Sequence, residues 1–106
     1  MAEEVLLVIS TFPDAETARQ ISTTLVTEKL AACANILPAV QSIYRWQGKV
    51  EEEGEVLALF KTTRERFAEL QSKIRSLHPY DVPEILALPI PEGLPDYLRW
   101  VAESCS

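Results

Sequence analysis

The chain has 106 residues, of which 47% are hydrophobic and 25% are charged, and its formal net charge at pH 7 is −6. This length and composition predict one folded domain over residues 1–106 and exclude a disordered or low-complexity chain. The negative charge, with lysines and arginines scattered rather than clustered, argues against a nucleic-acid partner; it either attracts cations weakly or only keeps the protein soluble.

The two cysteines and the first residues of the chain indicate the cellular compartment. Cys33 and Cys105 lie far apart and match no metal or redox spacing, so a disulfide framework is not expected. The apolar run at residues 5–9 is too short for a membrane span, and it follows two glutamates where a secretory signal would be basic. We therefore expect a cytoplasmic protein with no membrane partner.

The first third of the chain has the pattern of a strand, a helix and a second strand. Residues 5–9 are continuously apolar, which is typical of a strand covered on both faces. Asp14 is expected to cap a helix that carries an apolar stripe over residues 18–26 and ends near residue 30. The uncharged run at residues 31–37 should lead into the second strand.

A long hairpin is expected next. From Val40 apolar and polar residues alternate as in a strand, and Pro38 marks a bulge or bend just before it. Gln47 and Gly48 supply the turn, and the returning strand should run from Val50 through the apolar residues 56–60.

The second half repeats the strand–helix–strand order. Residues 62–65 have the pattern of a capping box for a helix whose apolar stripe extends from Phe67 to Leu77. Pro79 should end this helix by disfavouring helical geometry at His78. Residues 84–88 are the expected fourth strand, and a short helix around residues 97–101 follows a run of turns.

This order predicts an α+β, ferredoxin-like βαββαβ sandwich with a C-terminal helix. In such a fold the two main helices cover only one face of the sheet. The strands nevertheless carry apolar residues on both faces, and an exposed apolar sheet face on that scale usually marks an interface. We therefore expect an oligomer.

The common enzyme motifs are absent from the sequence, which has no glycine-rich phosphate loop, Walker motif, G-x-S-x-G elbow or H-E-x-x-H. His78 is the only histidine, and Cys33 shows no sign of activation as a nucleophile. An acylphosphatase-like activity would need an arginine after the first strand, and residues 10–13 contain none. We expect a protein that is not an enzyme.

The segment from His78 to Glu84 stands out because two prolines fix its backbone around an imidazole, a phenol and two carboxylates. One interpretation is structural, with His78 capping the preceding helix and Tyr80 packing on the sheet. The other is a metal site completed by further subunits, because one chain offers too few nitrogen and sulfur ligands for copper or zinc.

Three other features have alternative interpretations. Lys61 lies either at a strand end in solvent or beside an acid such as Glu84 or Glu55. Tyr44 and Trp46 share one strand face, where aromatic pairs more often form an interface or core than stack on a ligand. The acidic run at residues 51–53 is either a carboxylate cluster for metal binding or acid–base chemistry or, more simply, a solvated surface.

A series of motifs in a fixed order extends over nearly the whole chain. They are Thr11-Phe12-Pro13, Leu30-Ala31-Ala32-Cys33-Ala34-Asn35, the spaced Ser42, Tyr44, Trp46 and Gly48, Lys61-Thr62-Thr63, His78-Pro79-Tyr80, Pro83-Glu84-Ile85, and Tyr97-Leu98-Arg99-Trp100. By their number and order, the sequence resembles the CutA family, the divalent-cation tolerance proteins.

The resemblance implies a ferredoxin-like subunit in a tight cytoplasmic homotrimer whose long hairpin strands pair between subunits. It also implies copper(II) binding and a part in metal tolerance; distant animal members are linked to membrane anchoring of acetylcholinesterase. The metal ligands proposed in some members are a cysteine at the end of the first strand and two histidines before Pro-Tyr. Here Ser10 and Leu77 stand at two of those positions, and His78 is the remaining histidine.

We therefore predict a homotrimer that binds copper(II) or another divalent cation weakly, with no organic cofactor. The metal candidates are His78 and Glu84, and the candidates for an intersubunit pocket or interface are Cys33, Tyr44, Trp46, Lys61, Tyr80 and Trp100. The alternative is a signalling or scaffold trimer, because the architecture resembles that of PII-type regulators, which bind small effectors between subunits.

Overall fold

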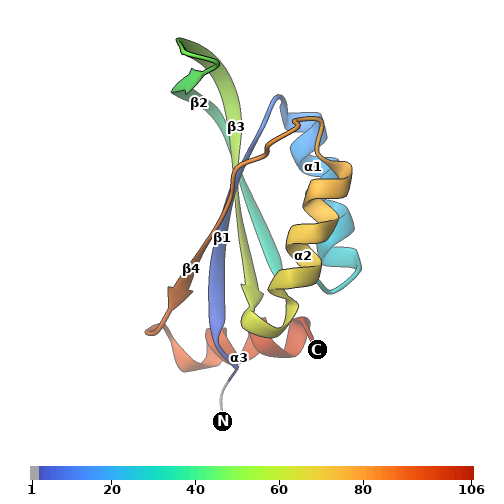
Figure 1. Ribbon diagram of the computed structural model, residues 1–106. Helices are drawn as coiled ribbons and strands as arrows, with labels where there is room; N and C mark the ends of the chain where they lie inside the picture. Colours follow the sequence, from blue (N-terminus) through green and yellow to red (C-terminus); the bar gives the residue numbers. More distant parts are fainter. Residues whose placement is uncertain (1–2) are drawn as a thin grey trace.

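The computed structural model describes residues 3–106 as a four-stranded antiparallel sheet with three helices. In chain order the elements are β1 (Val5–Phe12), α1 (Ala15–Thr27), β2 (Cys33–Trp46), β3 (Lys49–Thr63), α2 (Arg64–Leu77), β4 (Ile85–Ile90) and α3 (Pro95–Ser104). The strand order is β2-β3-β1-β4, and α1 and α2 lie side by side on one face of the sheet (Figure 1). The predicted α+β, ferredoxin-like fold is confirmed.

The main core lies between the sheet and these two helices. Alternate residues of β1, such as Val8 and Phe12, point toward the helices and are fully buried. Phe12 packs edge-on against Phe60 of β3, with ring centroids 6.5 Å apart. Helices α1 and α2 contribute buried side chains at helical spacing, including Leu25 and Leu70. Leu77, predicted to belong to the same stripe, is instead 44% exposed at the last residue of α2.

The two helices begin differently. Asp14 caps α1 as predicted, since its Oδ1 accepts a hydrogen bond from the Thr17 amide at 2.7 Å. The capping box predicted at Thr62 and Glu65 is wrong. The Thr62 hydroxyl donates to the Leu30 carbonyl instead, and Glu3 accepts from the Glu65 amide. A segment distant in sequence therefore satisfies the start of α2.

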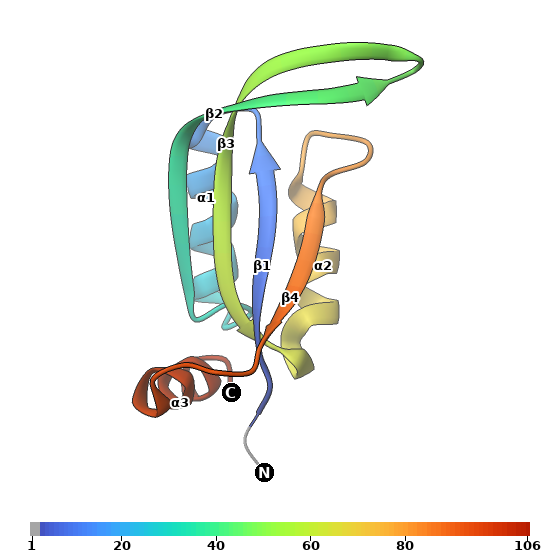
Figure 2. The same cartoon turned by 90° about the vertical axis from the view of Figure 1, so that its left-hand side faces the viewer.

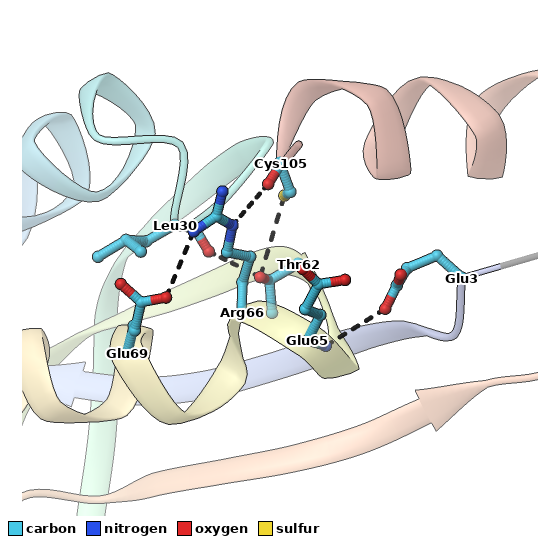
Figure 3. A network of polar contacts seen from close by, with 7 residues as sticks. All are labelled: Glu3, Leu30, Thr62, Glu65, Arg66, Glu69 and Cys105. Atoms are coloured by element: carbon cyan, nitrogen blue, oxygen red, sulfur yellow. Dashed lines mark hydrogen bonds and ion pairs between the residues drawn. The ribbon is translucent and has the colours of Figure 1, made fainter.

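Helix α3 packs across the end of the sheet that lies opposite the hairpin tip. Figure 3 shows Arg66 Nε donating to the Cys105 carbonyl at 2.6 Å, with the Thr62 hydroxyl 4.0 Å from the Cys105 sulfur. Val101 and Cys105 bury their side chains there against Val5. Burial raises the pKa of the Cys105 thiol.

The β2–β3 hairpin is longer than the rest of the sheet. The predicted bulge is present as a register shift between Leu37 and Val40, and Gln47 and Gly48 form the turn with φ angles of 49° and 80°. Strand β1 ends at Phe12 opposite Val56, so the two-stranded ribbon that β2 and β3 form beyond that point (residues 40–55) has no third strand beside it among residues 3–106. The ribbon bends toward the same side as the loop that joins α2 to β4 (Figure 2).

The sheet face away from α1 and α2 is apolar and largely open. Leu86 and Leu88 of β4 lie on it, and they are 57% and 46% exposed. Leu57 and Leu59 of β3 face the same side and are half-buried. Within residues 3–106 no helix is long and apolar enough to cross a membrane.

Ser22 offers a test of the core. Its Oγ is a buried side-chain polar atom with no hydrogen-bond partner among residues 3–106. We expect Ser22→Ala to raise the free energy of unfolding by about 1 kcal/mol, because an unsatisfied buried hydroxyl is removed. Denaturant titration at one fixed protein concentration measures this, since the stability of an oligomer depends on concentration.

Ser72→Ala is the matched control, because Ser72 is an exposed serine inside α2 and its replacement changes only helix propensity. A stabilisation no larger in Ser22→Ala than in Ser72→Ala would contradict the assignment of Ser22 as an unsatisfied group.

Candidate functional site

The side chain of His78 joins the end of β1 to the loop after α2. Its Nε2 lies 2.7 Å from the Thr11 carbonyl oxygen, and its Nδ1 lies 3.1 Å from the Tyr80 amide nitrogen. The amide can only donate, so Nδ1 is the acceptor and Nε2 carries the proton that Thr11 accepts. The ring also stacks on Phe12 with a centroid distance of 4.8 Å, and the residue is 8% exposed.

His78 is the C-cap residue of α2, as one of the two interpretations expected, but its side chain does not cap the helix. The His78 backbone amide donates to the Ile74 carbonyl at the end of α2, whereas the imidazole contacts β1 and the following loop. Both ring nitrogens therefore have backbone partners. A metal ion could bind His78 only after one of these hydrogen bonds broke.

Tyr80 extends the connection to the hairpin. Its hydroxyl donates to Glu55 Oε2 at 2.7 Å, and Glu55 is 8% exposed. Burial, followed by the hydrogen bond to this carboxylate, raises the pKa of Tyr80 well above its usual value. On the neighbouring strand, the Ser10 hydroxyl donates to the Glu84 carbonyl at 2.7 Å and positions the start of β4. The predicted segment from His78 to Glu84 is thus held by several hydrogen bonds to β1 and β3, and we call it the corner.

A cavity of about 640 Å³ lies between this corner and the bent hairpin. Its walls include Tyr44 and Trp46 from β2, alternate glutamates from β3, and residues 80–82 and 84 from the loop. Tyr44 donates to Glu53 Oε1 at 2.9 Å, and this hydrogen bond to a carboxylate raises the pKa of Tyr44. No three His, Cys, Asp or Glu side chains within residues 3–106 converge closely enough to hold one metal ion.

Comparisons with known proteins give the family. The model of the CutA1 divalent ion tolerance protein family matches residues 6–104. The chain belongs to the CutA1 family. The divalent-cation tolerance protein CutA of Thermus thermophilus is 54% identical over 96% of this chain and 97% of its own. A solved structure of the divalent cation tolerance protein from Thermus thermophilus has a TM-score of 0.94 at 51% identity, covering 96% of this chain and 99% of that one.

More distant relatives extend the comparison. The chain is 46% identical to the CutA homolog of Xenopus laevis over 88% of its length, and it spans only 62% of that longer protein. The solved structure described as the periplasmic divalent cation tolerance protein CutA of Archaeoglobus fulgidus has a TM-score of 0.93 at 37% identity, covering 96% of this chain and 99% of that one.

In this CutA1-family chain the predicted site residues fall into separate groups. Tyr44, Trp46, Tyr80 and Glu84 line the same cavity, beside which His78 is buried. Trp100 lies on α3 against Tyr97, with ring centroids 5.5 Å apart.

Cys33 and Lys61 form a group of their own, where they face each other across β2 and β3. Of the two interpretations of Lys61, pairing with an acid such as Glu84 or Glu55 is wrong. Its ammonium group instead donates to Asn35 Oδ1 and lies 3.8 Å from the Cys33 sulfur, because β2 is its immediate neighbour in the sheet.

The sequence interpretation preferred a solvated surface for the glutamates of the ribbon and did not predict the cavity that they line. Glu51 and Glu53 line it together with Glu55, whereas Glu52 does not. The sequence signal for these cavity residues was the alternation of carboxylates at positions 51, 53 and 55, opposite the aromatic face of β2. This alternation could not predict a cavity, because the cavity forms only where the bend brings the ribbon over the loop.

The bond between Tyr80 and Glu55 can be tested directly. We expect Tyr80→Phe to lower the free energy of unfolding by about 1–3 kcal/mol, because it leaves a buried carboxylate oxygen without its donor. Tyr44→Phe removes the same type of hydrogen bond at a more exposed position and should cost less than about 0.5 kcal/mol. Equal losses in the two variants, measured by denaturant titration, would contradict a structural role for Tyr80.

Proposed function

We propose that this CutA1-family protein is a non-catalytic, cytoplasmic homotrimer that binds divalent cations and takes part in tolerance to divalent metals. The observation that supports this most directly is the family match over residues 6–104, together with close identity to proteins named for divalent-cation tolerance. No observation on the described residues favours the PII-like signalling alternative over this role.

Two features of the subunit support assembly into a trimer. The open sheet face exposes leucines of β4, and burying apolar surface is the main driving force for association. The ribbon formed by residues 40–55 also has backbone edges that no strand in the described part of the chain covers, and such open edges are the usual starting point for pairing between chains. Tyr44 and Trp46 on that ribbon are the first candidates for contacts between subunits.

The proposed cation site is the cavity beside His78. Glu84 and Asp81 are its carboxylates nearest in sequence to His78, and further ligands would come from neighbouring subunits. Copper(II) favours nitrogen ligands, but both nitrogens of His78 are already hydrogen-bonded. We therefore propose weak binding of copper(II) or another divalent cation, through carboxylates first.

Light scattering tests the assembly. At micromolar concentration the measured mass should be three times the 11.9 kDa of the chain. Leu86→Lys should shift the mass toward that of one chain, because it places a charge on the open apolar face. Leu94→Lys, the same change at a 69% exposed position just before α3 and outside the cavity, is the control. A wild-type protein that scatters as a monomer would refute the trimer.

Calorimetric titration with copper(II) tests the cation site. We expect Glu84→Gln to weaken binding about tenfold, equivalent to about 1.4 kcal/mol, because one charged ligand is lost. Glu103→Gln, which removes the same charge from α3, should leave the affinity unchanged. Electron paramagnetic resonance of the copper(II) complex at pH 7 should then show whether nitrogen from His78 is coordinated. Absence of heat at millimolar metal would refute cation binding.

A further inference from the structure

The ribbon formed by residues 40–55 has few contacts that hold it in place in one subunit (Figure 2). Because β1 ends opposite Val56, β2 and β3 pair only with each other along the ribbon. Among residues 3–106, the side-chain hydrogen bond that joins the ribbon to the rest of the subunit runs from Tyr80 to Glu55, at the base of the ribbon. A two-stranded hairpin on its own is at best marginally stable in water, and a third strand or a packed face is needed to stabilise it.

The apolar side chains of the ribbon are exposed on both of its faces. Tyr44 and Trp46, which face the cavity, are 37% and 46% exposed. Ile43 and Val50, which strand alternation places on the other face, are 68% and 67% exposed. Burial of apolar surface is the main gain that offsets the conformational entropy lost when a chain folds. The ribbon obtains little of that gain from its own subunit.

The base of the ribbon is the least regular part of the sheet. Pro38 and Ala39 pair with no residue of β3, because the register shifts at this point. Ala39 has a φ angle of 64°, in the left-handed region that residues other than glycine rarely adopt. On β3, Gly54 lies close to this bulge, and a glycine inside a strand weakens the strand. The ladder is therefore interrupted where the ribbon leaves the body of the sheet.

The rest of the subunit does not depend on the ribbon for its stability. Strand β1 pairs with both β3 and β4, and side chains such as Leu6 and Phe60 are completely buried. Different parts of one protein open with different free energies, and the lowest values belong to parts that bury few apolar contacts. The ribbon can therefore unfold locally while the sheet and the helices stay folded.

The hairpin turn nevertheless favours the ribbon once a covering surface is present. Gln47 and Gly48 have φ angles of 49° and 80°, and two positive values are typical of the type I′ turn, whose twist matches that of the flanking strands. The turn and the strand pattern thus specify how the ribbon pairs. One subunit lacks only a surface that buries the apolar side chains of the ribbon.

We propose that the ribbon unfolds locally in a separated subunit and folds when subunits associate, so that the cavity beside His78 exists only in the assembled protein. The ribbon supplies the walls from β2 and β3, whereas Thr11 and the loop after α2 supply the rest. This inference rests on the proposed homotrimer and extends it, because assembly then creates the cavity. By mass action, a ligand held in the cavity would in turn favour the assembled state.

Amide hydrogen exchange of the full-length protein, followed by mass spectrometry, tests this coupling. In the wild type at micromolar concentration, amides of residues 41–53 should exchange slowly. In Leu86→Lys, which is expected to separate the subunits, the same amides should exchange at least about tenfold faster, while those of β1 should change less than about twofold. Leu94→Lys is the matched control and should leave both the mass and the ribbon exchange unchanged. Leu88→Lys, at the other exposed leucine of β4, replaces Leu86→Lys if that variant exchanges rapidly in β1 as well.

The outcomes separate this inference from the proposed trimer. A monomeric Leu86→Lys whose ribbon amides exchange as slowly as those of a trimeric wild type would overturn the coupling and leave the trimer in place. A monomeric wild type with a slowly exchanging ribbon would overturn both. A monomeric wild type with a rapidly exchanging ribbon would refute the trimer but support local unfolding of the ribbon.

Gly54 provides a second test, at the base of the ribbon. A side chain at this position would have open space around it, and threonine favours strands. Adding Gly54→Thr to Leu86→Lys should therefore slow the exchange of residues 41–53 about threefold or more without restoring the trimer mass. Identical ribbon exchange with and without Gly54→Thr would contradict the assignment of this base as the boundary of local unfolding.

Discussion

The imidazole of His78 is the interaction on which the rest of the candidate site depends. By accepting from the Tyr80 amide and donating to the Thr11 carbonyl, it fixes the loop after α2 against the end of β1. Tyr80 then reaches Glu55 on β3, so one series of hydrogen bonds runs from β1 through the loop to the base of the hairpin. The only histidine of the chain therefore has a structural use that is complete without a ligand. Its stacking on Phe12 also ties the cavity to the hydrophobic core.

Strand β3 passes through two environments, and the boundary lies between Glu55 and Val56. From Val56 onward it is paired on both sides and alternates between the helical core and the open face. Before that point only β2 accompanies it, and the same alternation places carboxylates over the cavity instead. The end of β1 at Phe12 sets this boundary, because the chain must turn there into α1. One periodic strand thus supplies both core and site.

Local patterns were sufficient to predict the fold, because each depends on residues close in sequence. The Asp14 cap, the bulge after Pro38, the turn at Gln47 and the end of α2 before Pro79 were all predicted from neighbouring residues and are present. The failures required distant partners. Thr62 bonds to Leu30 rather than to its own helix, and Lys61 bonds to Asn35 rather than to an acid. The cavity was missed for the same reason, since Glu55 and Tyr80 meet only in the folded chain.

The proposed cation site makes a demand on its carboxylates that one subunit does not meet. A divalent ion needs several oxygens within one coordination shell, and the side chains of one subunit do not provide such a group within residues 3–106. Glu51, Glu53 and Glu55 occupy alternate positions of β3, and two residues of a strand span roughly 6.6 Å. Because the backbone holds these positions so far apart, β3 alone is a poor source of a complete coordination shell. The remaining ligands must therefore come from the loop after α2 or from another subunit, which is why the proposed cation site depends on assembly.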